Sequence, residues 1–351
     1  MDTVSHACFS YVVCRTSGVA KSPRAGLLAA GVAMLPDLDF LLIPFLPEVA
    51  RFAFHRGPSH SLFVALVMGV AGSIVLSKGL RMPQWRVAGL FFLAWAGHIL
   101  LDICTGFGVA LWWPLSHARV SVDLLFVVDP LATLPLLVAT LWDVRTNWGQ
   151  QKGHRRIAVT GLLLFAGYAA SAYGIRKHVT HEFRSRLREE GISVKKIHAE
   201  PTPFTHQLWY LCAETDDGFF ITYRSVWDGD DWERWRTVPR NQTPLQTFAS
   251  HPLLDKMAVV LEDGFTSQVI HDNHLEVTDL RLGKRYGWED DEAPFLFVYD
   301  VSRTSEGDLT WKMEKPKSRY DYGRLSALFA RVTGKIPPHR QRKQYPRKAP
   351  L

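Results

Sequence analysis

The sequence predicts an α-helical, polytopic membrane domain of about five transmembrane helices plus a short N-terminal helix, followed by a small, mostly antiparallel β (α+β) domain. Three observations lead to this fold class. Residues 25–175 are dominated by Leu, Val, Ala, Phe and Trp. The chain from residue 180 onward has the composition of a soluble protein, with short alternating segments. Ionisable residues in the apolar half are few and gather in short polar motifs.

The helical half contains five apolar segments long enough to cross a bilayer, which requires about 20 mostly apolar residues. They are 25–46, 60–78, 85–104, 122–142 and 156–175. The first of them contains Asp37 and Asp39, whereas the last has no acidic residue. Val4 to Val13 is apolar but too short to span, so we expect a half-helix or an interfacial segment.

Loop charges predict an orientation, because Lys and Arg are enriched in cytoplasmic loops. The basic loops alternate with poorer ones, which places the rich loops 15–24, 78–86 and 143–156 in the cytoplasm. Five spans then put the C-terminal domain on the periplasmic, extracytoplasmic side, and an even number of spans would reverse this. The ionisable motifs all fall at the outer level of the membrane under this topology.

The C-terminal half is expected to begin with a charged helix over about 178–190. Alternating or aromatic-rich segments predict strands at 207–213, 218–227, 256–261, 266–270, 274–282 and 295–302. Asp216-Asp217-Gly218 is typical of a hairpin turn. The resulting domains are a membrane-embedded metal-site domain (1–177), a soluble, mostly-β domain (178–330) and a basic disordered tail (331–351).

The tail carries seven Lys or Arg and no acidic residue, so its own charge of +7 equals the net charge of the whole chain. Its proline content favours disorder. No folded basic face or recognition motif accompanies it, so nucleic acid is not an expected partner. The four cysteines form no CxxC pair, and neither a disulfide framework nor a removable signal peptide is expected.

His98 and Asp102 are four residues apart on a predicted helix, so both side chains project from one face. They could bind one ion or two adjacent ions. The alternative is a histidine held by a carboxylate inside a helix bundle. Ionisable groups are costly in lipid and are usually functional there, which favours the first interpretation.

His55 and His60 flank a turn at Gly57-Pro58, and Ser59 is placed to cap the next helix. The turn brings the two rings close together, although two interfacial histidines remain the alternative. Arg56 could stabilise an anionic substrate or transition state. It could equally be a positive residue at the lipid headgroups.

Asp37 and Asp39 would point in nearly opposite directions on an α-helix. Pro36 supplies a reason for a break, and a broken segment could aim both carboxylates at one site. Alternatively, Asp37 caps a second half-helix and Asp39 binds nothing. We expect at least one carboxylate ligand here, because intramembrane Asp is rarely unpaired.

His6 can join these groups only if the N-terminal segment dips back into the membrane with its start facing outward. Capping, packing or loop roles are expected instead for the weaker candidates, Asp123, Asp129, Cys104, His271 and His274. The sequence contains no Gly-x-Ser-x-Gly elbow and no His-Glu-x-x-His motif, which disfavours serine hydrolases and the commonest membrane metalloproteases.

Taken in order, these motifs resemble the bacterial inner-membrane, predicted metal-dependent hydrolases grouped with the LexA-binding putative hydrolase. The matching pieces are Val4-Ser5-His6, Pro36-Asp37-Leu38-Asp39, residues 55–61, residues 98–102 and Trp113-Pro114. The resemblance covers about residues 1–175, and the C-terminal domain looks like the extension of longer members. It implies a multi-pass protein of the cell inner membrane with a divalent-metal site. By motif position, the residues carried over are His6, Asp37, Asp39, His55, His60, His98 and Asp102.

The first functional hypothesis is a membrane-bound, metal-dependent hydrolase. Mixed His and Asp ligands suit zinc best, and also manganese or iron. The metal would activate a water, Asp37 or Asp102 would accept its proton, and Arg56 would offset negative charge. A site near the headgroups favours a lipid-linked or phosphate-ester substrate. The second hypothesis is non-enzymatic: a metal-stabilised membrane scaffold, or an ion or proton transporter.

Overall fold

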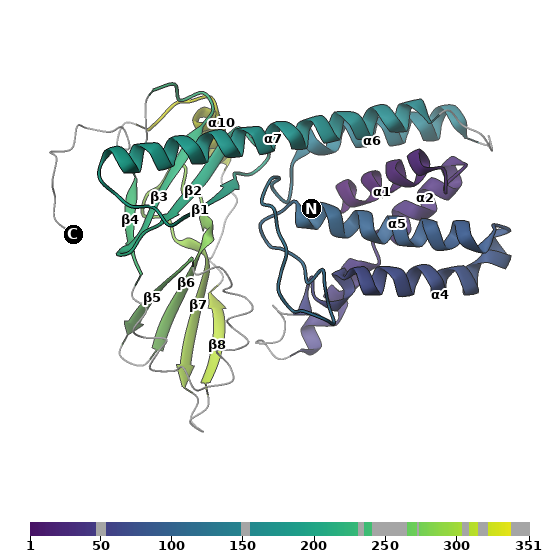
Figure 1. Ribbon diagram of the computed structural model, residues 1–351, viewed down its shortest axis with the longest axis horizontal. Helices are drawn as coiled ribbons and strands as arrows, with labels where there is room; N and C mark the ends of the chain where they lie inside the picture. Colours follow the sequence, from purple (N-terminus) through teal and green to yellow (C-terminus); the bar gives the residue numbers. More distant parts are fainter. Residues whose placement is uncertain are drawn as a thin grey trace. The chain divides into compact units, whose positions relative to one another are not determined.

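The structure, a computed structural model, describes residues 1–46, 54–148, 155–230, 235–240, 265–271, 274–303, 309–314 and 322–337. The chain divides into two compact units, and the first contains Met1–Ala172 with Pro203–Thr205. Its helices are α1 (Thr3–Ser17), α2 (Pro23–Val32), α4 (Leu62–Leu80), α5 (Gln84–Ile103) and α6 (Pro130–Asn147), with three 3₁₀ segments, η1 (Pro36–Leu41), η2 (Ile43–Phe45) and η3 (Pro58–His60) (Figure 1). Helix α7 (Arg156–Glu189) begins in this unit and ends in the second.

Four helical segments within the described residues are long and apolar enough to cross a membrane. They are Pro23–Phe45, Leu62–Leu80, Gln84–Ile103 and Arg156–Glu189. The expected span 122–142 corresponds to α6, which begins only at Pro130 and carries Asp143 and Arg145 near its end. Helix α6 is not among the four, so the expected count of about five spans is not confirmed.

The first candidate span is broken, as Pro36 predicts. Helix α2 ends at Val32, and Pro36 opens η1, because proline has no N–H to continue the α-helical ladder. Side chains three residues apart eclipse one another on a 3₁₀ helix. The break therefore decides which carboxylates of this segment share a face.

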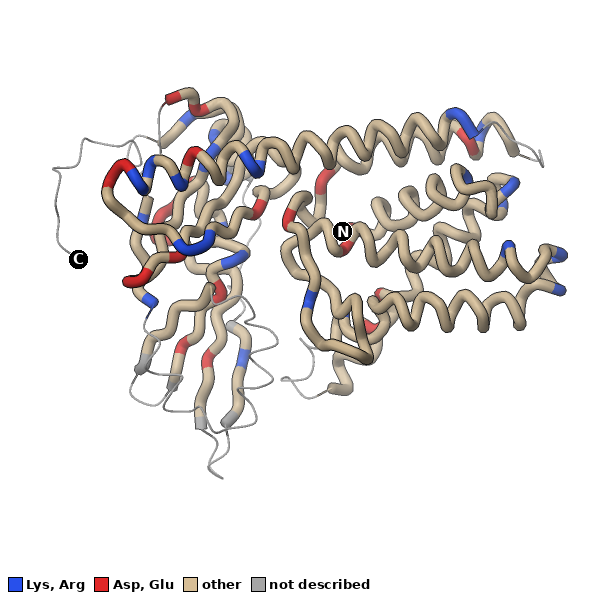
Figure 2. Tube along the Cα trace, viewed as in Figure 1, with Lys and Arg blue, Asp and Glu red and all other residues tan. Residues whose placement is uncertain are grey.

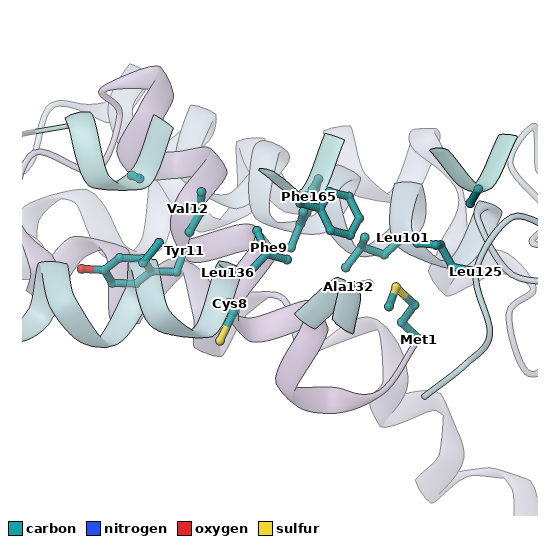
Figure 3. Packing of buried hydrophobic residues seen from close by; sticks show 13 residues of the cluster. Met1, Cys8, Phe9, Tyr11, Val12, Leu101, Leu125, Ala132, Leu136 and Phe165 are labelled. Atoms are coloured by element: carbon teal, nitrogen blue, oxygen red, sulfur yellow. The ribbon is translucent and has the colours of Figure 1, made fainter. Parts of the chain in front are cut away.

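The short N-terminal helix α1 lies in the interior of the first unit. Asp2 caps it by accepting hydrogen bonds from the backbone N–H groups of Val4 and Ser5. Figure 3 shows side chains of α1 packed with residues from α5, α6 and α7. This cluster includes Phe9, Tyr11, Val12, Leu101, Leu136 and Phe165. Helix α1 is thus a core element rather than an interfacial one.

Charge is distributed unevenly over the first unit. Figure 2 shows most of its Lys and Arg at the end where α4 passes into α5, and most of its Asp and Glu at the opposite end, near the N-terminus. Between these ends the helices carry almost uncharged surfaces with many exposed apolar side chains, as expected for contact with lipid.

The second unit contains two four-stranded antiparallel sheets, in the orders β1-β2-β3-β4 and β5-β6-β7-β8. The strands are β1 (Lys196–Pro201), β2 (Leu208–Glu214), β3 (Gly218–Ser225), β4 (Arg236–Pro239), β5 (Thr266–His271), β6 (His274–Lys284), β7 (Phe295–Arg303) and β8 (Leu309–Glu314). The mostly antiparallel β prediction is confirmed in this form. The expected strand 256–261 lies outside the described residues.

The charged helix expected at 178–190 is the last part of α7. Val179, Phe183 and Leu187 recur every four residues and pack on Trp209 and Leu211 of β2. Helix α10 (Tyr322–Val332) was not predicted; its Arg331 donates to both oxygens of Asp228, at 2.6 and 2.8 Å. Of the predicted basic tail, residues 338–351 lie outside the described residues.

Candidate metal centre

Four ionisable side chains converge near the end of α5. His60, His98, Asp37 and Asp102 each offer one ligand atom, and all four atoms lie within 4.8 Å of one another. We call these residues the quartet. The Nε2 atoms of His60 and His98 are 3.0 Å apart. Asp37 Oδ1 is 3.4 Å from both nitrogens, and Asp102 Oδ2 is 3.4 Å from that of His60 and 3.6 Å from that of His98.

The nitrogen–oxygen separations of 3.4–3.6 Å suit a tetrahedral metal ion, whereas the two Nε2 atoms, at 3.0 Å, lie closer together than in such a site. Zinc–nitrogen and zinc–oxygen bonds of about 2.0–2.2 Å put the donors of a tetrahedron roughly 3.3–3.6 Å apart. Asp102 Oδ2 is also buried without a hydrogen-bond partner. Because an unpaired buried carboxylate oxygen is costly, its position facing the two imidazoles fits a bound cation.

Hydrogen bonds at the far side of each ring set the tautomers. His98 Nδ1 is 2.7 Å from the carbonyl oxygen of Ala33, which can only accept, so this nitrogen carries a proton. Ser59 Oγ donates to Asp39 Oδ2 at 2.8 Å and therefore accepts from His60 Nδ1 at 2.9 Å. Both neutral rings then turn an Nε2 lone pair toward the other, the arrangement in which imidazoles bind a metal.

The electrostatics of the quartet favour a positive charge at its centre. Burial lowers the pKa of His60, but the nearby carboxylates of Asp102 and Asp37 oppose it, and the net direction of the pKa shift is upward. A cation, whether a proton or a metal ion, is therefore stabilised between the imidazoles and the carboxylates. Metal binding would compete with protonation of His60.

Three structural elements position the quartet. Helix α5 supplies His98 and Asp102 one turn apart, η1 supplies Asp37, and η3 supplies His60. The side chains of His60 and His98 are fully buried and that of Asp102 is 1% exposed, whereas that of Asp37 is 33% exposed. Asp37 is thus the one member of the quartet that a substrate or solvent molecule can contact.

The second oxygen of Asp102 is held by positive groups. Asp102 Oδ1 accepts from Arg56 Nη2 at 2.9 Å and from the N-terminal ammonium of Met1. His6 Nε2 lies 3.0 Å from the carbonyl oxygen of Met1 and 3.3 Å from Asp102 Oδ1. The His6 ring stacks on that of His98, with centroids 3.8 Å apart. His6 therefore lies next to the quartet, because α1 begins beside Asp102.

Arg56 contacts Asp102 rather than the centre of the quartet. Its second terminal nitrogen donates to Thr105 Oγ1 at 3.0 Å, and its guanidinium lies over the ring of Phe107. The backbone of Arg56 is left-handed, with φ of 58°, a conformation that costs energy in a residue with a side chain. Its N–H donates to Asp39 Oδ2 at 3.3 Å, which holds this turn in place.

Asp39 and His55 lie beside the quartet, not among its donor atoms. Asp39 Oδ1 is 3.0 Å from His55 Nδ1, and Asp39 Oδ2 accepts from Ser59 Oγ and the Arg56 backbone. One carboxylate thus ties η1 to the turn that carries His60. These side chains, and that of His6, contact other protein groups here. Metal ligation by Asp39, His55 or His6 therefore remains a prediction.

The weaker candidates also lie outside the quartet. Asp129 caps α6 through the N–H groups of Leu131 and Ala132 and accepts from the hydroxyl of Tyr168. Cys104 packs against the apolar cluster of Figure 3. Asp123 adopts a left-handed backbone with φ of 46°. His271 and His274 are paired across β5 and β6.

Two features were not anticipated from the sequence. Ser61, not Ser59, caps α4, which frees Ser59 to connect Asp39 with His60. Arg15, interpreted as a loop charge, is buried against Asp143, with nitrogen–oxygen distances of 2.6 and 3.0 Å. A signal for this pair existed in the i,i+4 polar pairs Tyr11/Arg15 and Asp143/Asn147, whose members share helix faces.

Comparison with known proteins gives a family. A family model described as YdjM inner membrane protein matches residues 1–179. Inner membrane protein YbcI of Escherichia coli (strain K12) is 35% identical over 97 residues, which are 26% of this chain and 56% of that protein. The chain therefore spans little more than half the length of this relative. No solved structure matches.

Proposed function

Because this chain belongs to the YdjM inner membrane protein family, we propose that its helical unit is a membrane-bound, metal-dependent hydrolase built around the quartet. It is a multi-pass inner-membrane protein, and the part of the chain that the structure describes contains four helical segments able to span the bilayer. The observation that supports the proposal is the 3.0 Å approach of two imidazole Nε2 atoms beside the unpaired Asp102 Oδ2. A divalent cation satisfies all three atoms at once.

The donor set suits zinc first, with manganese or iron as alternatives. Such an ion supplies Lewis acidity and makes water nucleophilic near neutral pH. Asp102 is buried and bound to Arg56, so its role is to hold the site. Asp37 is the exposed carboxylate and is the better placed to accept a proton from water. Hydrolysis then delivers hydroxide to the ester and the proton to the leaving alcohol.

Arg56 acts through Asp102 in this proposal. Its guanidinium neutralises the oxygen that faces away from the quartet and leaves the other oxygen for the metal. It is a positioning residue, since both of its terminal nitrogens are engaged by protein groups.

The reaction is tested by assaying detergent-purified protein on phosphate-ester and lipid-ester substrates. Activity should disappear with a chelator and return with zinc or manganese. Asp37→Asn should lose most turnover while retaining bound metal, and Asp216→Asn, an exposed carboxylate of the second unit, should behave as wild type. A metal-loaded protein that hydrolyses neither substrate class would refute the hydrolase.

A metal-stabilised scaffold is the second candidate, and one observation favours it. Four protein donors lie within 4.8 Å of one another, and a set of four protein ligands is typical of structural rather than catalytic zinc. The two candidates differ at Asp37: a catalytic site requires this carboxylate to yield a position to water. Metal exchange that is slow in wild type and accelerated by Asp37→Asn would favour the scaffold.

We also propose an orientation and domain boundaries. If the basic end of the first unit faces the cytoplasm, the quartet lies at the periplasmic level and α7, which starts at that basic end, leads outward. The C-terminal domain would then be periplasmic, which requires α6 to cross the bilayer in addition to the four candidate spans. The boundaries that accompany this topology are 1–177, 178–330 and a basic tail at 331–351.

A further inference from the structure

The exposed side of the quartet is bordered by apolar side chains. Asp37 lies on η1, where residues three apart eclipse one another, so Phe40 lies on the same face. Phe40 is 56% exposed, and its neighbours Leu38 and Leu41 are 51% and 67% exposed. The Phe40 ring also packs on the ring of His55, with centroids 4.1 Å apart. A molecule that reaches Asp37 along this face must therefore contact Phe40.

The other members of the quartet offer no comparable contact, because their side chains are at most 1% exposed. The apolar surface beside Asp37 belongs to the candidate span Pro23–Phe45 of an inner-membrane protein. Exposed Phe and Leu side chains of a membrane span face hydrocarbon, whereas a water-facing approach would be lined by polar groups. The surroundings of Asp37 thus match a molecule that is polar at one end and apolar along the rest.

We propose that the quartet takes an amphiphile directly from the bilayer, with its polar head at Asp37 and its hydrocarbon chain along Phe40 and Leu41. This inference rests on the proposed function and narrows its substrate to a membrane lipid ester. Phe40 is then a specificity-determining residue, because it contacts the chain next to the head. Binding should strengthen with chain length, since each methylene removed from water adds to affinity.

The test measures lipid binding without requiring turnover. A nitroxide label is placed at Leu41→Cys in the full chain with Cys104→Ala as background, because the other three cysteines are buried. The control label is at Val75→Cys on α4, a site with similar exposure, 73%. Lipid-depleted, metal-loaded protein is titrated with a long-chain dialkyl ether phosphatidylglycerol, which cannot be hydrolysed at its chains, and with the short-chain analogue.

We expect the long-chain lipid to immobilise the label at position 41 at a concentration about tenfold lower than at position 75. The short-chain analogue should show no such difference, and Phe40→Ser should remove the preference while metal content stays unchanged. Equal immobilisation at both labels would mean general lipid contact and would overturn the inference. Relaxation of the label at position 41 by a water-soluble reagent, rather than by oxygen, would mean that this face contacts water, and it would also overturn the inference.

Hydrolysis is scored separately with the matching diacyl lipid. Preferential immobilisation at position 41 without hydrolysis would support the lipid-binding inference and refute the reaction. Hydrolysis of short-chain and long-chain esters alike, with equal immobilisation at both labels, would support the reaction and refute the lipid route.

Discussion

The Nε2 atoms of His60 and His98 face each other at 3.0 Å, while the Nδ1 atoms of both rings are bound elsewhere. This relationship is unfavourable for two neutral imidazoles unless a positive charge lies between them. Asp37 and Asp102 supply the negative oxygens that stabilise such a charge. In our proposal this charge is a divalent metal ion, which the four donors can coordinate together.

The connection from Asp39 through Ser59 to His60 should tune metal affinity without carrying the metal. Asp39→Asn or Ser59→Ala removes the group that fixes the His60 tautomer, and losses of partners of this kind typically cost about 10–100-fold in affinity. Competition with a chelator measures the change. If Asp39→Asn removes the metal as completely as His60→Ala, Asp39 is itself a ligand.

The buried pair of Arg15 and Asp143 should stabilise the first unit. Asp143→Asn leaves the Arg15 guanidinium without its counter-ion, and breaking a buried pair costs about 3–5 kcal/mol. The double variant Arg15→Met with Asp143→Leu should recover much of this loss, since neither charge is then left unpaired. Thermal unfolding in detergent measures both. An unchanged Tm in Asp143→Asn would contradict the assignment.

Part of this architecture follows from local rules. The i,i+4 spacing of His98 and Asp102 predicts one helix face, and the structure gives it. Pro36 predicts a break, but whether Asp37 or Asp39 faces the centre depends on the kind of break. In the 3₁₀ segment, residues two apart point in different directions, so Asp37 faces the imidazoles and Asp39 faces the turn at residues 55–59.

Other features depend on contacts distant in sequence. His6 reaches Asp102 only because α1 packs inside the helical unit, which no local pattern of a short apolar segment can reveal. Ser59 is the expected cap of the next helix, but Ser61 caps it, because the 3₁₀ turn Pro58–His60 moves the start of α4 to Leu62. Helix α6 was expected to span from 122, yet Pro130 is its first residue, with Asp129 as its cap.

The second unit should lose stability in mild acid through His206. Burial lowers the pKa of this imidazole below its usual value of 6.5. As the pH falls below 6.5, the unfolded chain binds a proton at His206 before the folded chain does. The free energy of unfolding therefore decreases until the pH reaches the pKa of His206 in the folded state. His206→Asn should reduce the fall in Tm between pH 8 and about pH 5.5, values on either side of the ordinary histidine pKa. An unchanged fall would contradict this origin.

The orientation can be tested with alkaline phosphatase fused to the C-terminus, an enzyme active only outside the cytoplasm. Charge in the loops predicts an active fusion. A matched fusion within the loop between α4 and α5, at the basic end of the first unit, should be inactive. The reverse pattern would place the quartet at the cytoplasmic level.

Metal content of the purified full-length protein tests the quartet most directly. Elemental analysis should find close to one divalent ion per chain in wild type, and less than about a tenth of that in the His60→Ala, Asp102→Ala variant, because only two of the four donors remain. The control variant His178→Ala, Asp216→Asn removes one exposed histidine and one exposed carboxylate and should keep the wild-type content. Full metal retention in His60→Ala, Asp102→Ala would contradict a metal centre at these residues.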